Sequence, residues 1–455
     1  MRNTKREFCS YLIFDYRGVE AHLSKMAARG WRLEKIGPYF WTYRRAEPAQ
    51  VAYAVTYLPS VSQFSPEPSA DRENLEELCV AAGWEPVAEW AQMQIFANQR
   101  PDPVPLETED AVRIEAIHRS MKKNFLPSNY VLLALPLLWL FMAFSDFRRD
   151  PIDFFSSGTD FFLILLSILL LALQGVNLSA YYRWRKRSLA AVAQGGPCAA
   201  TGGYRWFNQA AFVVLAIITA AYLASLVLWQ RTSAGVYVLW LLIFGLILLA
   251  VLCTREGLKH IGAPKRLNMA LTLAVDVILA VGAISLLTFG ILRLGWFTGE
   301  GETYLYQNQE WQTDPPVIPL TAGDLTGISY DHIRRWEYGS SSPFMSRRTW
   351  SETACQDESN GDARYHLSYT VTRTGISRLY DLVLQETMAN EHPDFWTITW
   401  QQTDPEPWGA EAVWRRYMDG TATGTWLVCW PGQIVELELD GEPDSTQMAA
   451  AGAIL

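Results

Sequence analysis

Long apolar runs alternate with polar connections through the middle of the chain. Five runs of about 18 to 26 residues hold few charges and cover residues 126–144, 161–181, 207–229, 236–253 and 267–292. A helix needs about 20 apolar residues to cross a bilayer. One such run alone is also compatible with a buried core helix, but five in succession favour a membrane protein. We expect an α-helical bundle of about five transmembrane helices over residues 126–295, with the lipid bilayer as a partner.

Positive charges gather in alternate connections of this bundle. They are Arg119, Lys122 and Lys123 before the first span, Arg183, Arg185, Lys186, Arg187 and Arg205 after the second, and Arg255, Lys259, Lys265 and Arg266 after the fourth. Because cytoplasmic loops carry an excess of Lys and Arg, five spans place the N-terminus in the cytoplasm and the C-terminus outside. The first residues contain no apolar stretch long enough for a signal peptide, which agrees with this topology. The predicted location is the cell membrane, in multi-pass form.

Residues 1–100 repeat one pattern of strands and a helix. Strand-like runs at 9–14, 31–36 and 39–44 surround a helical pattern at 19–29, and runs at 51–58, 86–90 and 93–97 surround another at 72–82. Ala28-Arg29-Gly30-Trp31 matches Ala81-Ala82-Gly83-Trp84 at a spacing of 53 positions. Each glycine follows a helix, where the left-handed cap position favours it. We predict a duplicated βαββ unit, a ferredoxin-like α+β domain of a kind that usually binds a partner or dimerises.

A proline-rich linker and a short helical pattern occupy residues 101–125. Val112, Ile114, Ile117 and Met121 recur near helical spacing just before the first span. This juxtamembrane helix either transmits movement from the domain to the span or is a passive, solvated extension. Both alternatives stay open at this point.

The N-terminal motifs resemble a known family. They are Phe14-Asp15-Tyr16, Met26-Ala27-Ala28-Arg29-Gly30-Trp31, Tyr39-Phe40-Trp41-Thr42-Tyr43 and Ala82-Gly83-Trp84-Glu85. This pattern, over about the first 120 residues, is similar to the domain-of-unknown-function 2812 family of uncharacterised bacterial membrane proteins. The resemblance implies a cytoplasmic-membrane location and, often, a neighbouring transcriptional regulator. It implies no activity and no catalytic residues.

The last block, residues 296–455, reads as a second α+β domain. Strand-like runs cover 365–372, 395–401, 425–430 and 434–439, and helical patterns cover 377–388 and 445–454. This block has no Lys and a net charge of −15, whereas the whole chain carries −9. We expect an acidic, solvated extracytoplasmic domain, and the acidic charge excludes a nucleic-acid partner.

Cysteine placement allows one external disulfide. Of the six cysteines, Cys355 and Cys429 alone fall in the predicted external domain. A bridge between them would close a loop of about 75 residues and contribute roughly 4 kcal/mol in the chain-entropy model. Free thiols are the other possibility, because many exported bacterial domains lack disulfides.

Catalytic, cofactor and metal motifs are missing from the sequence. It has no phosphate-binding loop, no His-Glu-x-x-His, no Cys-x-x-Cys and no Gly-x-Ser-x-Gly. Glu391-His392-Pro393-Asp394 contains metal-ligand residue types, but one such tetrapeptide is expected by chance. We therefore expect neither an enzyme nor a cofactor.

Asp276 is the acidic residue inside an apolar span. It lies about nine residues from the start of the last span, roughly 14 Å into a bilayer at 1.5 Å per residue. A charged Asp near the bilayer centre costs about 3 kcal/mol and often marks an ion path or a partner contact. Alternatively, Asp276 is protonated and bonded to Gln174 or Asn177, or the span starts later.

Two classes of function fit these features. The first is a non-catalytic sensor, regulatory or scaffolding protein whose residues 1–100 bind a cytoplasmic protein or another copy of the chain. The second is a transporter or transporter accessory subunit with Asp276 on an ion path. The sparse intramembrane charge favours the first class.

Overall fold

The computed structural model describes most of the chain. The described residues are 3–37, 40–66, 70–90, 92–107, 109–201, 204–229, 234–294, 302–307, 309–356, 364–389 and 397–455. They form two compact units, one of Met1–Trp139, Leu165–Val227 and Ser233–Phe289, and one of Leu140–Ile164, Leu228–Thr232 and Gly290–Leu455.

The N-terminal domain contains two βαββ repeats of equal topology. The first comprises β1 (Thr4–Phe8), α1 (Tyr16–Ala28), β2 (Trp31–Lys35) and β3 (Phe40–Arg45), and the second comprises β4 (Ala52–Tyr57), α2 (Ala70–Ala81), β5 (Glu85–Trp90) and β6 (Met93–Asn98). Both sheets are antiparallel, with strand orders β1-β3-β2 and β4-β6-β5. The duplication is therefore present in the structure, whereas the ferredoxin-like arrangement stays a prediction.

The first strand is not where the apolar pattern placed it. The strand is Thr4–Phe8, which pairs with β3 from Thr4↔Arg44 to Phe8↔Phe40. The predicted run at 9–14 follows it as a loop that helps to form the core, with Cys9 and Phe14 almost fully buried. The apolar residues at 9–14 belong to a buried loop. The apolar pattern alone does not distinguish such a loop from a buried strand.

Glycines end both repeated helices, as the motif predicts. Gly30 has φ +78° and Gly83 has φ +83°. The N–H groups of Gly30 and Gly83 donate to the carbonyls of Ala27 and Val80. The left-handed backbone reverses the chain into β2 and β5, as a glycine cap does.

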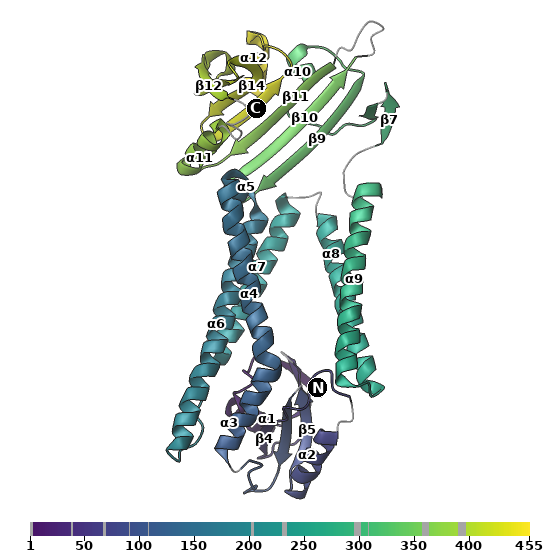
Figure 1. Ribbon diagram of the computed structural model, residues 1–455, viewed down its shortest axis with the longest axis vertical. Helices are drawn as coiled ribbons and strands as arrows, with labels where there is room; N and C mark the ends of the chain where they lie inside the picture. The colour runs from purple at the N-terminus through teal and green to yellow at the C-terminus, as the bar shows by residue number, and fades with distance from the viewer. Residues whose placement is uncertain are drawn as a thin grey trace. The chain divides into compact units, whose positions relative to one another are not determined.

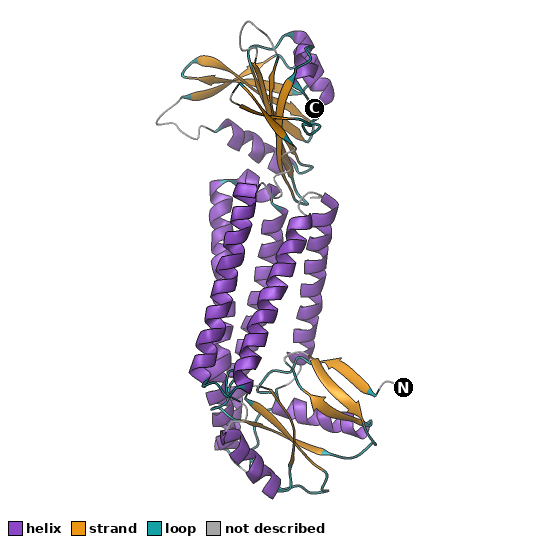
Figure 2. Ribbon diagram, turned by 90° about the vertical axis from the view of Figure 1, so that its right-hand side faces the viewer, coloured by secondary structure: helices purple, strands orange, loops and turns teal. Residues whose placement is uncertain are grey.

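Long apolar helices follow the N-terminal domain (Figure 2). Within the described residues, four helices are long and apolar enough to cross a membrane: α4 (Leu126–Arg149), α6 (Gly158–Ala193), α7 (Tyr204–Trp229) over Tyr204–Ser225, and α9 (Lys265–Leu294) over Lys265–Gly290. The fifth predicted span is covered by α8 (Ala234–His260), whose preceding residues 230–233 lie outside the described part. Four candidate spans are thus identified, and the crossing of α8 stays a prediction.

The juxtamembrane segment packs on the N-terminal domain. Helix α3 (Asp110–Ser120) continues through a π-helical turn, η1 (Met121–Phe125), into α4. Ile114, Ile117 and Met121 are buried in the same core as residues of α1, β3 and β4. These three residues lie against the domain, whereas Val112, the fourth residue of the predicted apolar pattern, is exposed.

The C-terminal domain is built on one antiparallel sheet of seven strands (Figure 1). Its strand order is β12-β13-β14-β15-β11-β10-β9. The strands are β9 (His332–Ser341), β10 (Ser346–Cys355), β11 (Arg364–Arg373), β12 (Ile398–Thr403), β13 (Ala412–Met418), β14 (Thr421–Trp430) and β15 (Gln433–Leu439). A separate hairpin joins β7 (Thr303–Tyr306) and β8 (Gln309–Gln312). The sequence pattern predicted β11, β12, β14 and β15 but not β9, β10 and β13, whose Arg, Ser and Thr residues interrupt the apolar alternation.

Each face of this sheet has its own core. The helical elements are α5 (Pro151–Ser156), α10 (Ala322–Thr326), α11 (Ser377–Met388), η2 (Glu406–Trp408) and α12 (Ser445–Ile454). Alternate residues of β14 face opposite ways, so Trp426 and Val428 join the core with α10, η2 and α12, whereas Leu427 joins the core with α5 and α11. The predicted helices at 377–388 and 445–454 are both present.

Candidate functional site

The connection between α6 and α7 packs against the N-terminal domain. Asp15 caps α1 by accepting a hydrogen bond from the N–H of Gly18 at 3.1 Å, and the hydroxyl of Thr201 donates to the same carboxylate. Burial raises the pKa of Asp15, although these hydrogen bonds favour its ionised form. The N–H of Cys198 donates to Oδ2 of Asp110 at 3.0 Å. The connection is therefore held by both α1 and α3.

Arg205, in the first turn of α7, contacts residues at and just after the end of β1. Its Nη1 donates to the Tyr11 hydroxyl at 2.5 Å, and its guanidinium carbon lies 4.6 Å from the centre of the Tyr11 ring. Its Nη2 lies 3.4 Å from Oε1 of Glu7, and its carbonyl accepts a hydrogen bond from Ser10. A cation over an aromatic ring and beside a carboxylate is a directional contact that depends on the position of α7.

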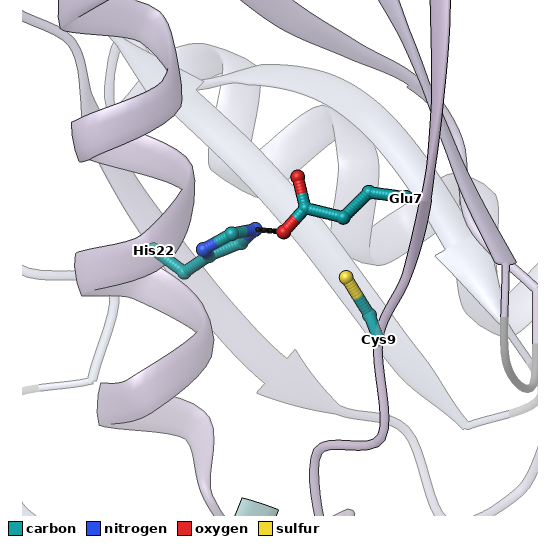
Figure 3. A group of neighbouring side chains, drawn as sticks. All are labelled: Glu7, Cys9 and His22. Carbon is teal, nitrogen blue, oxygen red and sulfur yellow. Dashed lines mark ion pairs between the residues drawn. The ribbon is translucent and has the colours of Figure 1, made fainter. Parts of the chain in front are cut away.

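Glu7, Cys9 and His22 form a polar group beside this contact (Figure 3). Nε2 of His22 lies 3.0 Å from the Tyr43 hydroxyl and 3.6 Å from Oε1 of Glu7. Burial raises the pKa of the Cys9 thiol to about 11. Burial lowers the pKa of His22, although the negative charge of Glu7 opposes this effect. Burial also disfavours ionised Glu7, but the hydrogen bond from Lys5 and neighbouring positive charges leave its pKa below the ordinary value.

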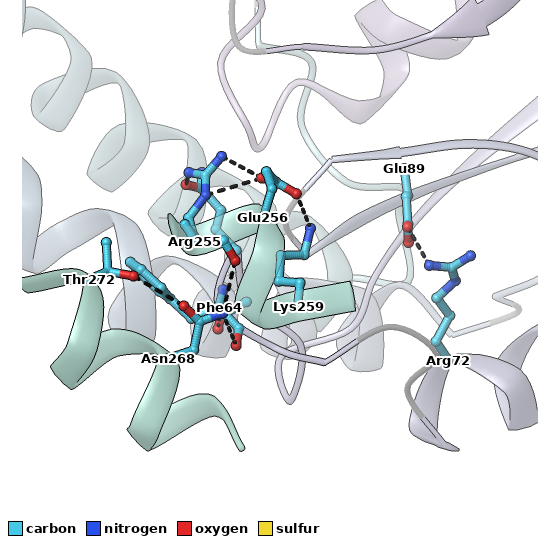
Figure 4. Close-up of polar contacts among 10 residues, drawn as sticks. Phe64, Arg72, Glu89, Arg255, Glu256, Lys259, Asn268 and Thr272 are labelled. Carbon is cyan, nitrogen blue, oxygen red and sulfur yellow. Dashed lines mark hydrogen bonds and ion pairs between the residues drawn. The ribbon is translucent and has the colours of Figure 1, made fainter. Parts of the chain in front are cut away.

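The end of α8 and the start of α9 contact another part of the same domain (Figure 4). Nη1 of Arg255 donates to the side chain of Gln63 at 3.0 Å. Nδ2 of the buried Asn268 donates to the carbonyl of Phe64 at 3.3 Å and to that of Arg255 at 3.2 Å. The Thr272 hydroxyl donates to Oδ1 of Asn268 at 3.1 Å, so the contact continues one turn along α9.

A third contact joins α3 to α6. Nδ1 of His118 lies 2.6 Å from the Tyr181 hydroxyl, and the two rings stack with centres 6.4 Å apart. Tyr181 also packs against Phe14, with ring centres 5.5 Å apart. The end of α6 thus shares a core with the N-terminal domain, together with the buried Trp184. We call the contacts of the N-terminal domain with residues 198–205, residues 255–272 and Tyr181 the docking network.

The C-terminal domain contains a pocket on the face of the sheet covered by α12. Its volume is about 380 Å³, within the usual range for small-molecule sites. The lining residues are Pro319, Ser341, Ser346, Arg348, Trp350, Val371, Arg373, Ile454 and Leu455. Trp350 and Val371 are buried and apolar, whereas Arg348 and Arg373 are exposed. Such a lining suits a small ligand with an apolar part and a carboxylate or similar anion.

The structure does not bring Asp276 to its predicted partners. Its side chain is exposed on α9, whereas Gln174 and Asn177 are partly buried on α6. No hydrogen bond joins these three described residues, and Oδ1 of Asn177 is buried without a partner. A function for Asp276 stays a prediction. The tetrapeptide at 391–394 lies outside the described residues.

The possible disulfide is not formed in this structure. Cys355 and Cys429 are both buried and free. Cys355 is on β10 and Cys429 on β14, with β15 and β11 between these strands. Three strand spacings amount to about 14 Å, well beyond the reach of a disulfide.

The residues of the docking network, and those of the polar group beside it, form no motif in the sequence. Arg205 was noted only as a loop cation, and Glu7, Cys9 and His22 show no motif spacing. The available signal was the apolar loop that contains Cys9 and Asp15, because an apolar loop indicates burial. The contacts that these residues make depend on how distant parts of the chain pack together.

Comparison with known proteins places only the first part of the chain. No curated protein and no solved structure matches the chain. A family model described as a protein of unknown function, DUF2812, matches residues 15–128. This segment includes both glycine-capped helices, α3 and the start of α4. Residues 15–128 therefore belong to the domain-of-unknown-function 2812 family, as the N-terminal motifs predicted.

Proposed function

We propose that this protein is a non-catalytic membrane sensor or regulatory protein. Its N-terminal domain lies in the cytoplasm of the cell and binds a protein partner or a second copy of the chain. Its acidic C-terminal domain lies outside the membrane and binds a small anionic ligand in the pocket beside Trp350. The family match and the apolar helices support the membrane setting, and they supply no activity.

The docking network carries this proposal. The N-terminal domain contacts Thr201 and Arg205, at and just before the start of α7, and it also contacts Arg255 of α8 and Asn268 of α9. A passive anchor needs only the covalent link through α3 and α4. Because these contacts come from two further places in the helical region, a shift of either helix pair changes contacts with the domain. A ligand that favours one helix arrangement would thereby change the population of domain conformations.

The test uses the full chain in intact cells. A photo-crosslinking amino acid is placed at Leu78, an exposed apolar residue of α2, and captured proteins are identified by mass spectrometry. Arg205→Ala removes the contacts with Tyr11 and Glu7, and Arg183→Ala, an exposed arginine of α6 that bonds its own helix, is the matched control. We expect a specific cytoplasmic protein or self-crosslink whose yield changes at least about threefold in Arg205→Ala and not in Arg183→Ala.

Two results would contradict the proposal. Capture that is unchanged by Arg205→Ala would remove the regulatory role of the docking network. Solute flux that is lost in Asp276→Asn, with unchanged capture, would favour the alternative of a transporter or accessory subunit with Asp276 on an ion path. The exposed position of Asp276 and its lack of a described bonding partner give that alternative less support.

A further inference from the structure

We propose that Glu7, Cys9 and His22 bind a divalent transition-metal ion of the zinc class. One ligand atom from each residue lies within 4.8 Å of the other two. The three side chains converge from β1, from the loop just after it and from α1 (Figure 3). This proposal concerns metal binding and does not depend on the regulatory function proposed above.

The ligand set has the chemistry that zinc prefers. A thiolate, an imidazole and a carboxylate bind zinc at about 2.3, 2.0–2.1 and 2.0–2.2 Å, respectively. Two ligands at these lengths around a tetrahedral ion lie about 3.3–3.7 Å apart. Nε2 of His22 and Oε1 of Glu7 are 3.6 Å apart, which already matches this spacing. The widest separation, at most 4.8 Å, requires a closure of about 1 Å by rotation of side chains.

Burial makes the group a defined site and not a surface cluster. Cys9 is 1% exposed, and the side chains of His22 and Glu7 are 11% and 23% exposed. Helix α1 and strand β1 hold the ligands on regular elements, which limits their movement. Three protein ligands leave a fourth position for water or for the Tyr43 hydroxyl, 3.0 Å from Nε2 of His22.

Neighbouring charges limit the affinity of the site. Lys5 lies 3.1 Å from Oε2 of Glu7, and Arg205 lies 3.4 Å from Oε1. Both cations oppose a bound cation; Lys5 is partly exposed and can turn toward solvent, whereas Arg205 is also held by the Tyr11 hydroxyl. A metal on Oε1 therefore competes with Arg205 for the same oxygen atom.

The experiment uses the full chain purified in detergent without chelator. We measure zinc content by elemental mass spectrometry and titrate the metal-free protein with Co²⁺, whose thiolate complexes absorb in the near ultraviolet. The expected result is about one metal per chain and a thiolate–Co²⁺ band. Cys9→Ser should abolish the band, and His22→Gln should weaken Co²⁺ binding at least about tenfold.

Cys79→Ser is the matched control, because Cys79 is a buried cysteine on the second repeat of the same domain. It should keep the band. If Cys9→Ser fails to fold, Glu7→Gln replaces it, with the same expected loss of affinity of about tenfold or more. Folded wild-type protein that shows no thiolate band overturns the proposal and leaves a hydrogen-bonded polar core only. A band that persists in Cys9→Ser also overturns it.

Discussion

Arg335 and Glu352 form a buried ion pair in the C-terminal domain. Nη2 and Nε of Arg335 lie 2.9 and 3.1 Å from Oε1 of Glu352, and Oε2 accepts the N–H of Ala322 at 2.6 Å. Glu352 is 1% exposed. Its carboxylate thus bonds α10 and β9 at once.

Arg335→Ala should therefore destabilise the protein strongly. It leaves a buried carboxylate without its cation, which typically costs about 3–5 kcal/mol. Arg348→Ala is the control, because Arg348 pairs with Glu337 at the surface, where a pair contributes about 1 kcal/mol or less. Denaturant unfolding of the full chain in detergent measures both. Equal losses in the two variants would show that Glu352 finds another partner.

His118 makes the attachment of α3 sensitive to pH. Burial and the positive charge of Arg185 lower the pKa of His118 below its ordinary value of 6.5. The unfolded chain then takes up a proton at a higher pH than the folded chain does. Stability is accordingly lost as the pH falls through 6.5, until the folded-state pKa is passed.

As the pH is lowered through 6.5, the melting temperature of the wild-type protein should fall relative to that of His118→Gln. His118→Gln cannot be protonated and lacks this dependence. Tyr181→Phe, which removes the hydrogen bond at 2.6 Å but keeps the imidazole, should retain the wild-type slope. Parallel pH curves for wild type and His118→Gln would exclude this assignment.

At the scale of elements, the two glycine caps are equivalent in backbone and different in surroundings. A Cβ on Gly30 would lie 2.8 Å from the backbone carbonyl oxygen of Ala46. On Gly83 it would meet the guanidinium of Arg100 at 2.9 Å, a side-chain end that can move away. The repeat is thus packed more tightly after α1 than after α2.

Gly30→Ala should cost more stability than Gly83→Ala. Both lose about 1–2 kcal/mol from a left-handed backbone, and Gly30→Ala has the additional clash with main chain. Gly175→Ala in α6, where a Cβ meets nothing within 4 Å, should be nearly neutral. Thermal unfolding of the full chain ranks the three. An equal effect at positions 30 and 83 would mean that Ala46 shifts freely.

Whether α8 crosses the membrane decides the topology of the whole molecule. Four crossings put both termini on one side, whereas α8 as a fifth puts them on opposite sides. Alternate positive connections and the apolar sequence of α8 support five. With five crossings and a cytoplasmic N-terminus, we expect the acidic C-terminal block, which has no Lys, to lie outside the cell.

Labelling of single cysteines tests this topology. Glu73→Cys on α2 and Gln401→Cys on β12 are placed in a Cys253→Ser background, because Cys253 is exposed and the other cysteines are buried. An impermeant maleimide should label position 401 in intact cells and position 73 only after lysis. Labelling of both positions, or of neither, in intact cells would support four crossings.

Local sequence was sufficient for features that depend on local chemistry. Apolar length predicted the four helices that qualify as spans, and the helical pattern at 445–454 predicted α12, which Asp444 caps. There Asp444 accepts the N–H groups of Thr446 and Gln447 at 2.8 Å. The match between Gly30 and Gly83 predicted two like repeats, because a left-handed cap requires a residue without a Cβ.

Tertiary structure decided the features that join distant segments. Arg205 meets Glu7 and Tyr11 across nearly two hundred residues, and no spacing rule connects such positions. Strand order separates Cys355 from Cys429, although both lie in strands, because β15 and β11 pair between them. Sequence periodicity reports which face of an element is apolar, whereas the partner of that face depends on the packing of the whole chain.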